Sequence, residues 1–266
     1  PPIVDAAGFA AVTEAIDQVV AKAQIPRAFV AGIGLAVPCP IPASGDAKVK
    51  ANIAINLPEL RVAIQEHCPD AVVKYENDAN AAAMGEAWLG SAKGVQNVVM
   101  VTIGTGVGAG VLSGGKLVHG MMHPEAGHIL VTRDPRDTIG EHSGCPFHDN
   151  CLEGLIAGPG VKKRWGGKSA GEMADDPEAM DLLAGYLAQA LMTYVLCYAP
   201  QKIVIGGGVA DHTPIVPLAR KKCAEMLNGY IVTPEMADID SYIVNNSLEG
   251  KQGIMGCLAL GAQALE

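Results

Sequence analysis

Short apolar runs alternate with helical patterns along this 266-residue chain. The continuous apolar run at 29–37 is typical of a buried strand, and the run at 71–76 predicts a short strand. The segment 97–120 predicts two strands with a Gly-rich turn between them, followed by a hairpin that closes at Gly114 and Gly115. Apolar residues at helical spacing predict helices at 5–23, with Asp5 as N-cap, and at 177–198. Strands that alternate with helices predict an α/β fold.

Composition narrows the class of protein. Hydrophobic residues make up 49% of the chain and charged residues 18%, which is typical of a globular protein. The net charge is −9 and no basic run exceeds 161–168, so we expect no nucleic-acid partner. No uninterrupted apolar run reaches the length of about 18 residues that a bilayer requires, so we expect no membrane partner. Seven scattered cysteines and no secretion signal predict free thiols in the cytoplasm.

Cysteine and histidine gather in the segment 123–154. Cys145, His148 and Cys151 stand in a C-x-x-H-x-x-C pattern, which brings two thiols and an imidazole into one loop. Zinc commonly takes four tetrahedral ligands of these types, so the pattern predicts a zinc site whose fourth ligand comes from elsewhere. The alternative is a disulfide between the two cysteines, which a reducing compartment disfavours.

Asp78 stands where a predicted strand gives way to a predicted helix. A carboxylate at such a sheet edge can act as a general base, or it can simply cap the helix. Gly-rich turns near Gly104 and Gly206 would let backbone N–H groups approach phosphate oxygens, although neither turn has the Walker A pattern.

Five motifs follow one another in order: ENDANAAAMGE, VTIGTGVGAGVLSGGKLVHG, HPEAGHI, CPFHDNCLEG and IVIGGGV. Together they resemble the ROK family of sugar kinases and related repressors, and most closely its bacterial fructokinase branch, from about Gly32 to the C-terminus. The resemblance implies a two-lobed actin-like (ribonuclease H-like) ATPase fold. It places a small α/β lobe at 1–95, with a C-terminal helix at about 252–266 packing back on it, and a large α/β lobe with the zinc loop at 96–251.

The resemblance also implies roles for individual residues. Asp78 matches the general base, and the family's sugar ligands fall on Asn56, Asn77, Glu125, His128 and Glu153. Its ATP-binding turns fall on Thr102, Gly104, Thr105, Gly106, Gly206, Gly207 and Gly208. The cofactors implied are ATP, Mg²⁺ and a structural Zn²⁺.

His128 is the family's match for the fourth zinc ligand, which gives the set His128, Cys145, His148 and Cys151. An imidazole can bind zinc through one ring nitrogen and touch sugar through the other. His123 and His142 remain rival fourth ligands. Glu153 could instead serve only as a first-turn helix residue, and Asn56 only as a loop cap.

The family usually opens with a D-x-G-G-T-K hairpin that surrounds the ATP phosphates, and no such element occurs here. Either the printed sequence lacks an N-terminal segment of the native protein, or the protein lacks the hairpin and is a poor kinase; the absence of an initial Met favours the former. The sugar-specificity region, 34–60, also departs from the usual fructokinase segment.

The resemblance therefore predicts an ATP-dependent hexose kinase that acts on fructose, and a homodimer. Glucose, mannose and N-acetylated hexosamines are alternative substrates. A sugar-sensing regulator of the same family and a non-catalytic sugar-binding protein are alternative functions.

Overall fold

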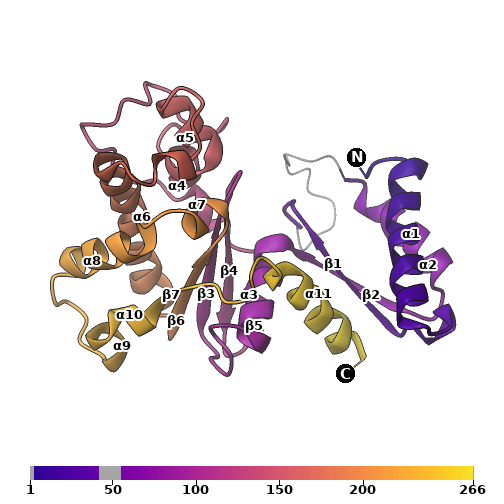
Figure 1. The fold of residues 1–266 in the computed structure, drawn as a ribbon. Helices are drawn as coiled ribbons and strands as arrows, with labels where there is room; N and C mark the ends of the chain where they lie inside the picture. The colour runs from indigo at the N-terminus through magenta and orange to yellow at the C-terminus, as the bar shows by residue number, and fades with distance from the viewer. Residues whose placement is uncertain (1–2, 42–54, 266) are drawn as a thin grey trace.

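The computed structural model describes residues 3–41 and 55–265, and it has two sheets (Figure 1). The smaller sheet pairs β1 (Gly32–Val37) with β2 (Val72–Asn77) in parallel. The larger sheet has the strand order β5-β4-β3-β6-β7. Its strands are β3 (Val98–Ile103), β4 (Val107–Ser113), β5 (Lys116–Leu117), β6 (Lys202–Gly206) and β7 (Ile243–Asn245).

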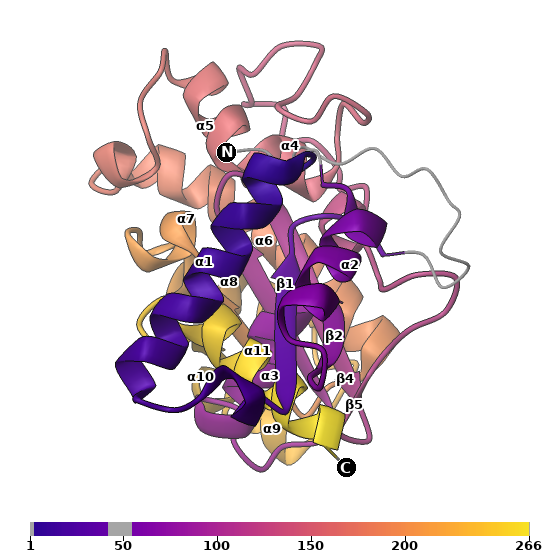
Figure 2. The same ribbon diagram turned by 90° about the vertical axis from the view of Figure 1, so that its right-hand side faces the viewer.

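Two helices pack on the small sheet, α1 (Ala6–Ala23) and α2 (Leu57–His67) (Figure 2). Asp5 caps α1 as predicted, because its side chain accepts a hydrogen bond from the Gly8 N–H at 2.9 Å. The expected strand at 29–37 is wrong at its start. Residues Arg27–Phe29 form a 3₁₀ turn, and the strand begins only at Gly32, where pairing with β2 begins.

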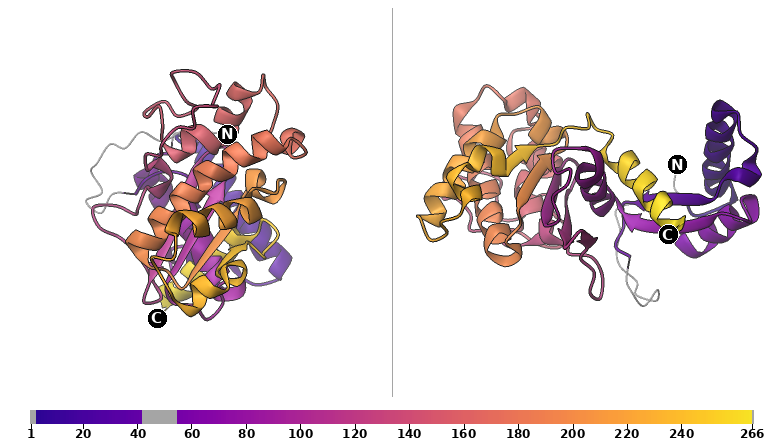
Figure 3. Two further views of the ribbon diagram at one scale, coloured as in Figure 1. Left: turned by 90° about the vertical axis from the view of Figure 1, so that its left-hand side faces the viewer. Right: turned by 90° about the horizontal axis from the view of Figure 1, so that it is seen from below.

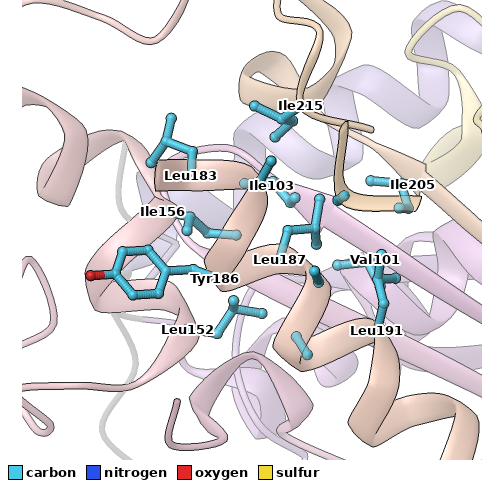
Figure 4. Packing of buried hydrophobic residues seen from close by; sticks show 14 of the residues in the cluster. Val101, Ile103, Leu152, Ile156, Leu183, Tyr186, Leu187, Leu191, Ile205 and Ile215 are labelled. Carbon is cyan, nitrogen blue, oxygen red and sulfur yellow. The ribbon is translucent and has the colours of Figure 1, made fainter. Parts of the chain in front are cut away.

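The large sheet carries the main core of the protein. The central helix α6 (Pro177–Tyr198) lies across its face and also packs against α8 (Ile215–Leu227). Side chains of β3, β6, α6 and the short helix α4 (Leu152–Ile156) interdigitate there, among them Val101, Ile205, Ile156 and Leu187 (Figure 4). The remaining helices on this side are α5 (Gly158–Arg164), α7 (Gly208–Asp211), α9 (Pro234–Ala237) and α10 (Ile239–Tyr242).

Helix α6 is the one helix of the described residues that is long and apolar enough to cross a membrane by length and composition. In the fold, 61% of its most apolar window is buried. Tyr186, Leu187 and Leu191 are among its residues with almost no exposed surface. Burial of this kind is typical of a core helix in a globular domain.

Helix α11 (Gln252–Ala262) packs against both α3 (Asp78–Leu89) and β1 (Figure 3). Glycines on both sides allow the backbones to meet. A Cβ on Gly256 would overlap the Ala81 carbonyl oxygen, and one on Gly34 would overlap that of Cys257. A 3₁₀ turn at Gln263–Leu265 follows the helix.

Helix α3 lies within the predicted small lobe, yet it packs on the large sheet. Ala82 and Ala83 are buried against Val98, Met100 and Leu112. The two sheets with their flanking helices agree with the two-lobed α/β arrangement that the resemblance implies. The lobe boundaries at residues 95 and 251 stay predictions.

Substitution of Gly256 by Ala should lower the free energy of unfolding by about 1–3 kcal/mol, because the new methyl group overlaps the backbone of α3. Gly253→Ala is the matched control, since a Cβ on Gly253 of the same helix meets nothing within 4 Å. That variant should be neutral or stabilised by up to about 1 kcal/mol through helix propensity. Urea unfolding measures both, and equal stability of the two variants would contradict the close packing of α11.

Candidate functional site

The predicted base lies at the junction between β2 and α3. Asn77 ends β2 and caps α3, with its Oδ1 accepting hydrogen bonds from the Ala79 N–H at 2.9 Å and the Asn80 N–H at 3.4 Å. Asp78 is thus the first residue of the helix, and the alternative that Asp78 is the N-cap is wrong. The Asn77 cap leaves the Asp78 side chain exposed.

Protein atoms surround much of the Asp78 carboxyl, although the residue is exposed to solvent. Desolvation by the surrounding protein raises the pKa of the Asp78 carboxyl above its ordinary value of 3.8, and the Ala79 N–H, at 2.9 Å, opposes this rise. The charges of His123 and Glu125 also act on this pKa, the first lowering it and the second raising it. Asp78 therefore shares one polar region with the predicted sugar-binding segment.

His123 is a member of this region that sequence reasoning weighed only as a metal ligand. Its side chain is 2% exposed, and its Nε2 lies 3.0 Å from Oε1 of Glu125. His123 Nδ1 is buried without a hydrogen-bond partner among the described residues. The contact restricts the orientation of the Glu125 carboxyl. Glu125 is the residue directly before the 3₁₀ turn Ala126–His128.

Glu153 connects the predicted sugar and phosphate segments. It lies in the first turn of α4, where Cys151 is the N-cap. Its Oε2 accepts a hydrogen bond from the Val107 N–H at 3.0 Å, and its Oε1 lies 3.9 Å from Nε2 of His128. The expected first-turn position of Glu153 is observed, and the carboxylate also reaches the turn between β3 and β4.

Backbone pairing brings the cysteines and histidines together. Val131 N–H donates to the Asn150 carbonyl at 3.0 Å, and Leu152 N–H donates to the Ile129 carbonyl at 2.9 Å. The segments that carry His128 and Cys151 therefore run side by side. The C-x-x-H-x-x-C loop folds back beside them.

The potential ligand atoms of His128, Cys145, His148 and Cys151 all lie within 4.8 Å of one another. His128 Nδ1 lies 3.8 Å from Cys145 Sγ and 3.7 Å from Cys151 Sγ, and His148 Nδ1 lies 3.8 Å from Cys145 Sγ. Two thiols and two imidazoles around one point form a possible metal site whose donor set suits a tetrahedral divalent ion. We call this group the Cys/His cluster.

The other two histidines considered as fourth ligand, and the disulfide considered for the cysteines, do not match the geometry. His123 pairs with Glu125, and His142 pairs through Nδ1 with Asp149 at 2.9 Å, so neither belongs to the group. Cys145 and Cys151 are free thiols rather than a disulfide. Burial, with a further contribution from the Cys145 thiol, raises the pKa of Cys151 to about 12. A bound cation would reverse this by stabilising the thiolates.

The two predicted nucleotide turns lie at one edge of the large sheet. Thr102 of β3 pairs in parallel with Gly206 of β6, so the turns that follow these strands are neighbours. Gly207 has a φ of 94°, and a Cβ there would lie 2.6 Å from the Ile103 carbonyl oxygen. Glycine is therefore required at Gly207 both for conformation and for space. In the turn Gly104–Thr105–Gly106, a Cβ on Gly104 meets nothing within 4 Å, whereas a Cβ on Gly106 would lie 2.7 Å from Oε2 of Glu153.

A further contact to this edge escaped sequence reasoning. Gly158 N–H, at the start of α5, donates to the Gly104 carbonyl at 2.8 Å. The Ala-Gly-Pro-Gly run that opens α5 was the available signal, and its meaning depends on a partner more than 50 positions away.

Asn56 lies away from these groups in sequence and caps α2. Its Oδ1 accepts a hydrogen bond from the Glu59 N–H at 3.4 Å. The capping alternative is therefore observed, and the sugar-binding role of Asn56 stays a prediction. Residues 42–54 of the predicted specificity region lie outside the described residues.

Comparison with known proteins identifies the family to which the chain belongs. The model of the ROK family matches residues 9–264, so the chain belongs to the ROK family. The chain is 43% identical over 192 residues to a fructokinase of Pediococcus pentosaceus, covering 72% of this chain and 65% of that protein. It is 40% identical over 199 residues to a fructokinase of Zymomonas mobilis, covering 74% and 64%.

Solved structures support the same fold. The ROK hexokinase of Thermus thermophilus superposes with a TM-score of 0.80 at 24% identity, covering all of this chain and 89% of that one. The chain spans just under two thirds of the length of the two curated fructokinases.

The Cys/His cluster should bind one Co²⁺ per chain, with sulfur-to-metal charge transfer and the strong visible bands of tetrahedral cobalt, because it offers two thiolates and two imidazoles. Cys151→Ala should remove these bands. His142→Ala is the control and should leave them unchanged, since His142 pairs with Asp149 outside the cluster. Optical titration of the chelator-treated protein measures the effect. Loss of the bands in the His142 variant, or their persistence in the Cys151 variant, would overturn the assignment.

Proposed function

We propose that this protein is an ATP-dependent sugar kinase that transfers the γ-phosphoryl group to fructose and forms fructose 6-phosphate. The observation that carries the proposal is the position of Asp78, which opens α3 beside Glu125 and His123. The names of the fructokinase relatives favour fructose as the acceptor.

In this mechanism Asp78 is the general base. Its carboxylate accepts the proton of the attacking sugar hydroxyl while the new oxygen–phosphorus bond forms, and the bond to the leaving ADP oxygen breaks. The position of Asp78 in the first turn of α3 contributes to stabilising the anion, because the positive end of the helix dipole lies there. The Ala79 N–H holds the carboxylate in place.

The sugar hydroxyls would be held by amide, carboxylate and imidazole groups, which suit paired donors and acceptors. The proposed ligands are Asn56, Asn77, Glu125, His128 and Glu153. His128 directs Nδ1 to the thiols and Nε2 toward Glu153, so its Nε2 is available to the sugar side.

The ATP phosphates would lie against the turn Gly104–Thr105–Gly106, with Thr102 at the end of β3 beneath it. The turn Gly206–Gly207–Gly208 would accept the adenosine side. A Cβ on Gly104 of the first turn or on Gly208 of the second meets nothing within 4 Å, which leaves room for a ligand to approach the backbone there. Mg²⁺ bound with ATP supplies positive charge that offsets the phosphate charge during transfer.

The Cys/His cluster would hold a structural Zn²⁺, since two thiolates and two imidazoles complete a tetrahedral shell and leave no open position. The ion would order the sugar-binding wall for a geometric reason. His128 follows Glu125 by three residues, and Cys151 caps the helix turn that carries Glu153. Cytoplasmic location, a homodimer, and the absence of nucleic-acid or membrane partners complete the proposal.

Other hexoses, such as glucose, mannose or an N-acetylated hexosamine, are the second candidates for the acceptor. A sugar-binding regulator without catalysis is the rival function from another class. It predicts binding of sugar without ADP release, so one assay separates the two functions.

Asp78→Asn should reduce turnover with fructose by about 10²–10⁴-fold, because the amide cannot accept the hydroxyl proton. Coupled ADP release by the full-length protein, with fructose, glucose, mannose and N-acetylmannosamine in turn, measures this and identifies the acceptor. Asp70→Asn, on the exposed turn before β2, is the matched control and should keep wild-type turnover. A folded Asp78 variant with full activity would rule out the base, and silence of the folded wild type with every sugar would refute the kinase.

The raised pKa of Asp78 also predicts a pH dependence. The base acts when ionised, so kcat/KM should rise with pH through the pKa of the free enzyme and fall as pH drops below it. Because desolvation raises this pKa, the acid limb should lie above the ordinary value of 3.8. A kcat/KM profile recorded where the protein stays folded measures the limb. An inflection at or below the ordinary value would contradict the environment assigned to Asp78.

A further inference from the structure

Glu76 is a buried carboxylate two residues before the proposed base, and the mechanism above does not use it. The residue is 6% exposed. Its Oε1 accepts hydrogen bonds from the Asn77 N–H at 2.8 Å and from Asn80 Nδ2 at 2.9 Å. Its Oε2 lies 3.1 Å from Nε2 of His119.

These contacts join both sides of the β2–α3 junction. Asn77 precedes Asp78, and Asn80, which has no exposed surface, follows it within the first turn of α3. One carboxylate oxygen therefore links the end of the strand to the start of the helix across the residue that carries the base. A charged acceptor makes stronger hydrogen bonds than a neutral one, so this link restricts the backbone of Asp78.

The third contact reaches another segment. His119 follows β5, and the chain continues from it to His123 and Glu125. The His119–Glu76 pair therefore attaches the start of the sugar-binding segment to the junction that presents Asp78.

We propose that Glu76 is a positioning residue, which sets the orientation of Asp78 through Asn77 and Asn80 and ties the His119 segment to the same junction. This inference rests on the proposed kinase function. It assigns no contact between Glu76 and the substrate.

The chain offers a matched control for a merely structural role. Glu86 lies in the same helix, has no exposed surface, and accepts hydrogen bonds from the Ser91 N–H at 2.7 Å and the Ser247 N–H at 3.1 Å. Like Glu76, it is therefore a buried carboxylate with hydrogen-bond donors on both oxygens, but it lies about two helical turns away from Asp78. Loss of Glu86 should lower stability and leave the junction intact.

The test compares Glu76→Met, Glu76→Gln and Glu86→Met in the full-length protein, below the unfolding temperature of each. Glu76→Met removes the acceptors, and kcat with fructose should fall about 10- to 100-fold, as expected for a small misplacement of a catalytic group, while KM changes less than about fivefold. Glu76→Gln keeps an oxygen that can accept from Asn77 and Asn80, and it should recover most of kcat. Glu86→Met should keep wild-type kcat.

A wild-type kcat in folded Glu76→Met would overturn the inference, and so would an equal loss of kcat in Glu86→Met. If Glu76→Met does not fold, Asn80→Ala removes the helix side of the link. It should lower kcat about tenfold, and full activity in folded Asn80→Ala would contradict the proposal.

Native-state hydrogen exchange separates this inference from the kinase function, because it requires no turnover. Amides 77–80 should exchange faster in Glu76→Met than in the wild type and be unchanged in Glu86→Met. Should the wild type be silent with every sugar, the kinase function fails and exchange alone decides the role of Glu76. Unchanged exchange at 77–80 would then overturn it.

Discussion

The close contact of α11 with α3 and β1 is the constraint on which the arrangement of the two sheets depends. Gly256 approaches the backbone of α3, and Gly34 of β1 approaches the backbone of α11, at separations that exclude a side chain. Helix α3 is packed on the large sheet through Ala82 and Ala83. A single helix from the C-terminus therefore links the small sheet to the large one, and the β2–α3 junction with Asp78 lies where the two meet.

A second constraint acts on the opposite wall of the site. The strand-like pairing of 129–131 with 150–152 brings His128 to the loop that carries Cys145 and His148. The same pairing sets Glu153 against the turn between β3 and β4 through Val107. The segments proposed to bind sugar, phosphate and metal thus contact one another, so the geometry of one depends on the others.

Local sequence predicted those parts of the fold whose determinants are local. The helix cap at Asp5, the Gly114–Gly115 hairpin and the Cys145/His148/Cys151 pattern depend on residues within a few positions. The strand start at Phe29 was wrong because an apolar run does not reveal where pairing with β2 begins. Likewise, Asn77 takes the capping role expected as an alternative for Asp78, since both residue types cap helices well.

Parts of the site that depend on distant partners could not be derived from spacing. The contact of Gly158 with Gly104 and the pair of Glu76 with His119 each join segments that only the tertiary fold brings together. The burial of His123 likewise depends on the tertiary fold. The family resemblance predicted which residues bind sugar and metal, but it predicted none of these contacts.

The most direct measurement of the central claim is the product of the reaction, followed by ³¹P NMR with full-length protein, Mg·ATP and fructose labelled with ¹³C at C6. The account predicts ADP and one phosphate monoester in equal amounts, with the phosphorus coupled to the labelled C6. Unchanged ATP in the presence of bound fructose, or ADP accompanied only by inorganic phosphate, would contradict it.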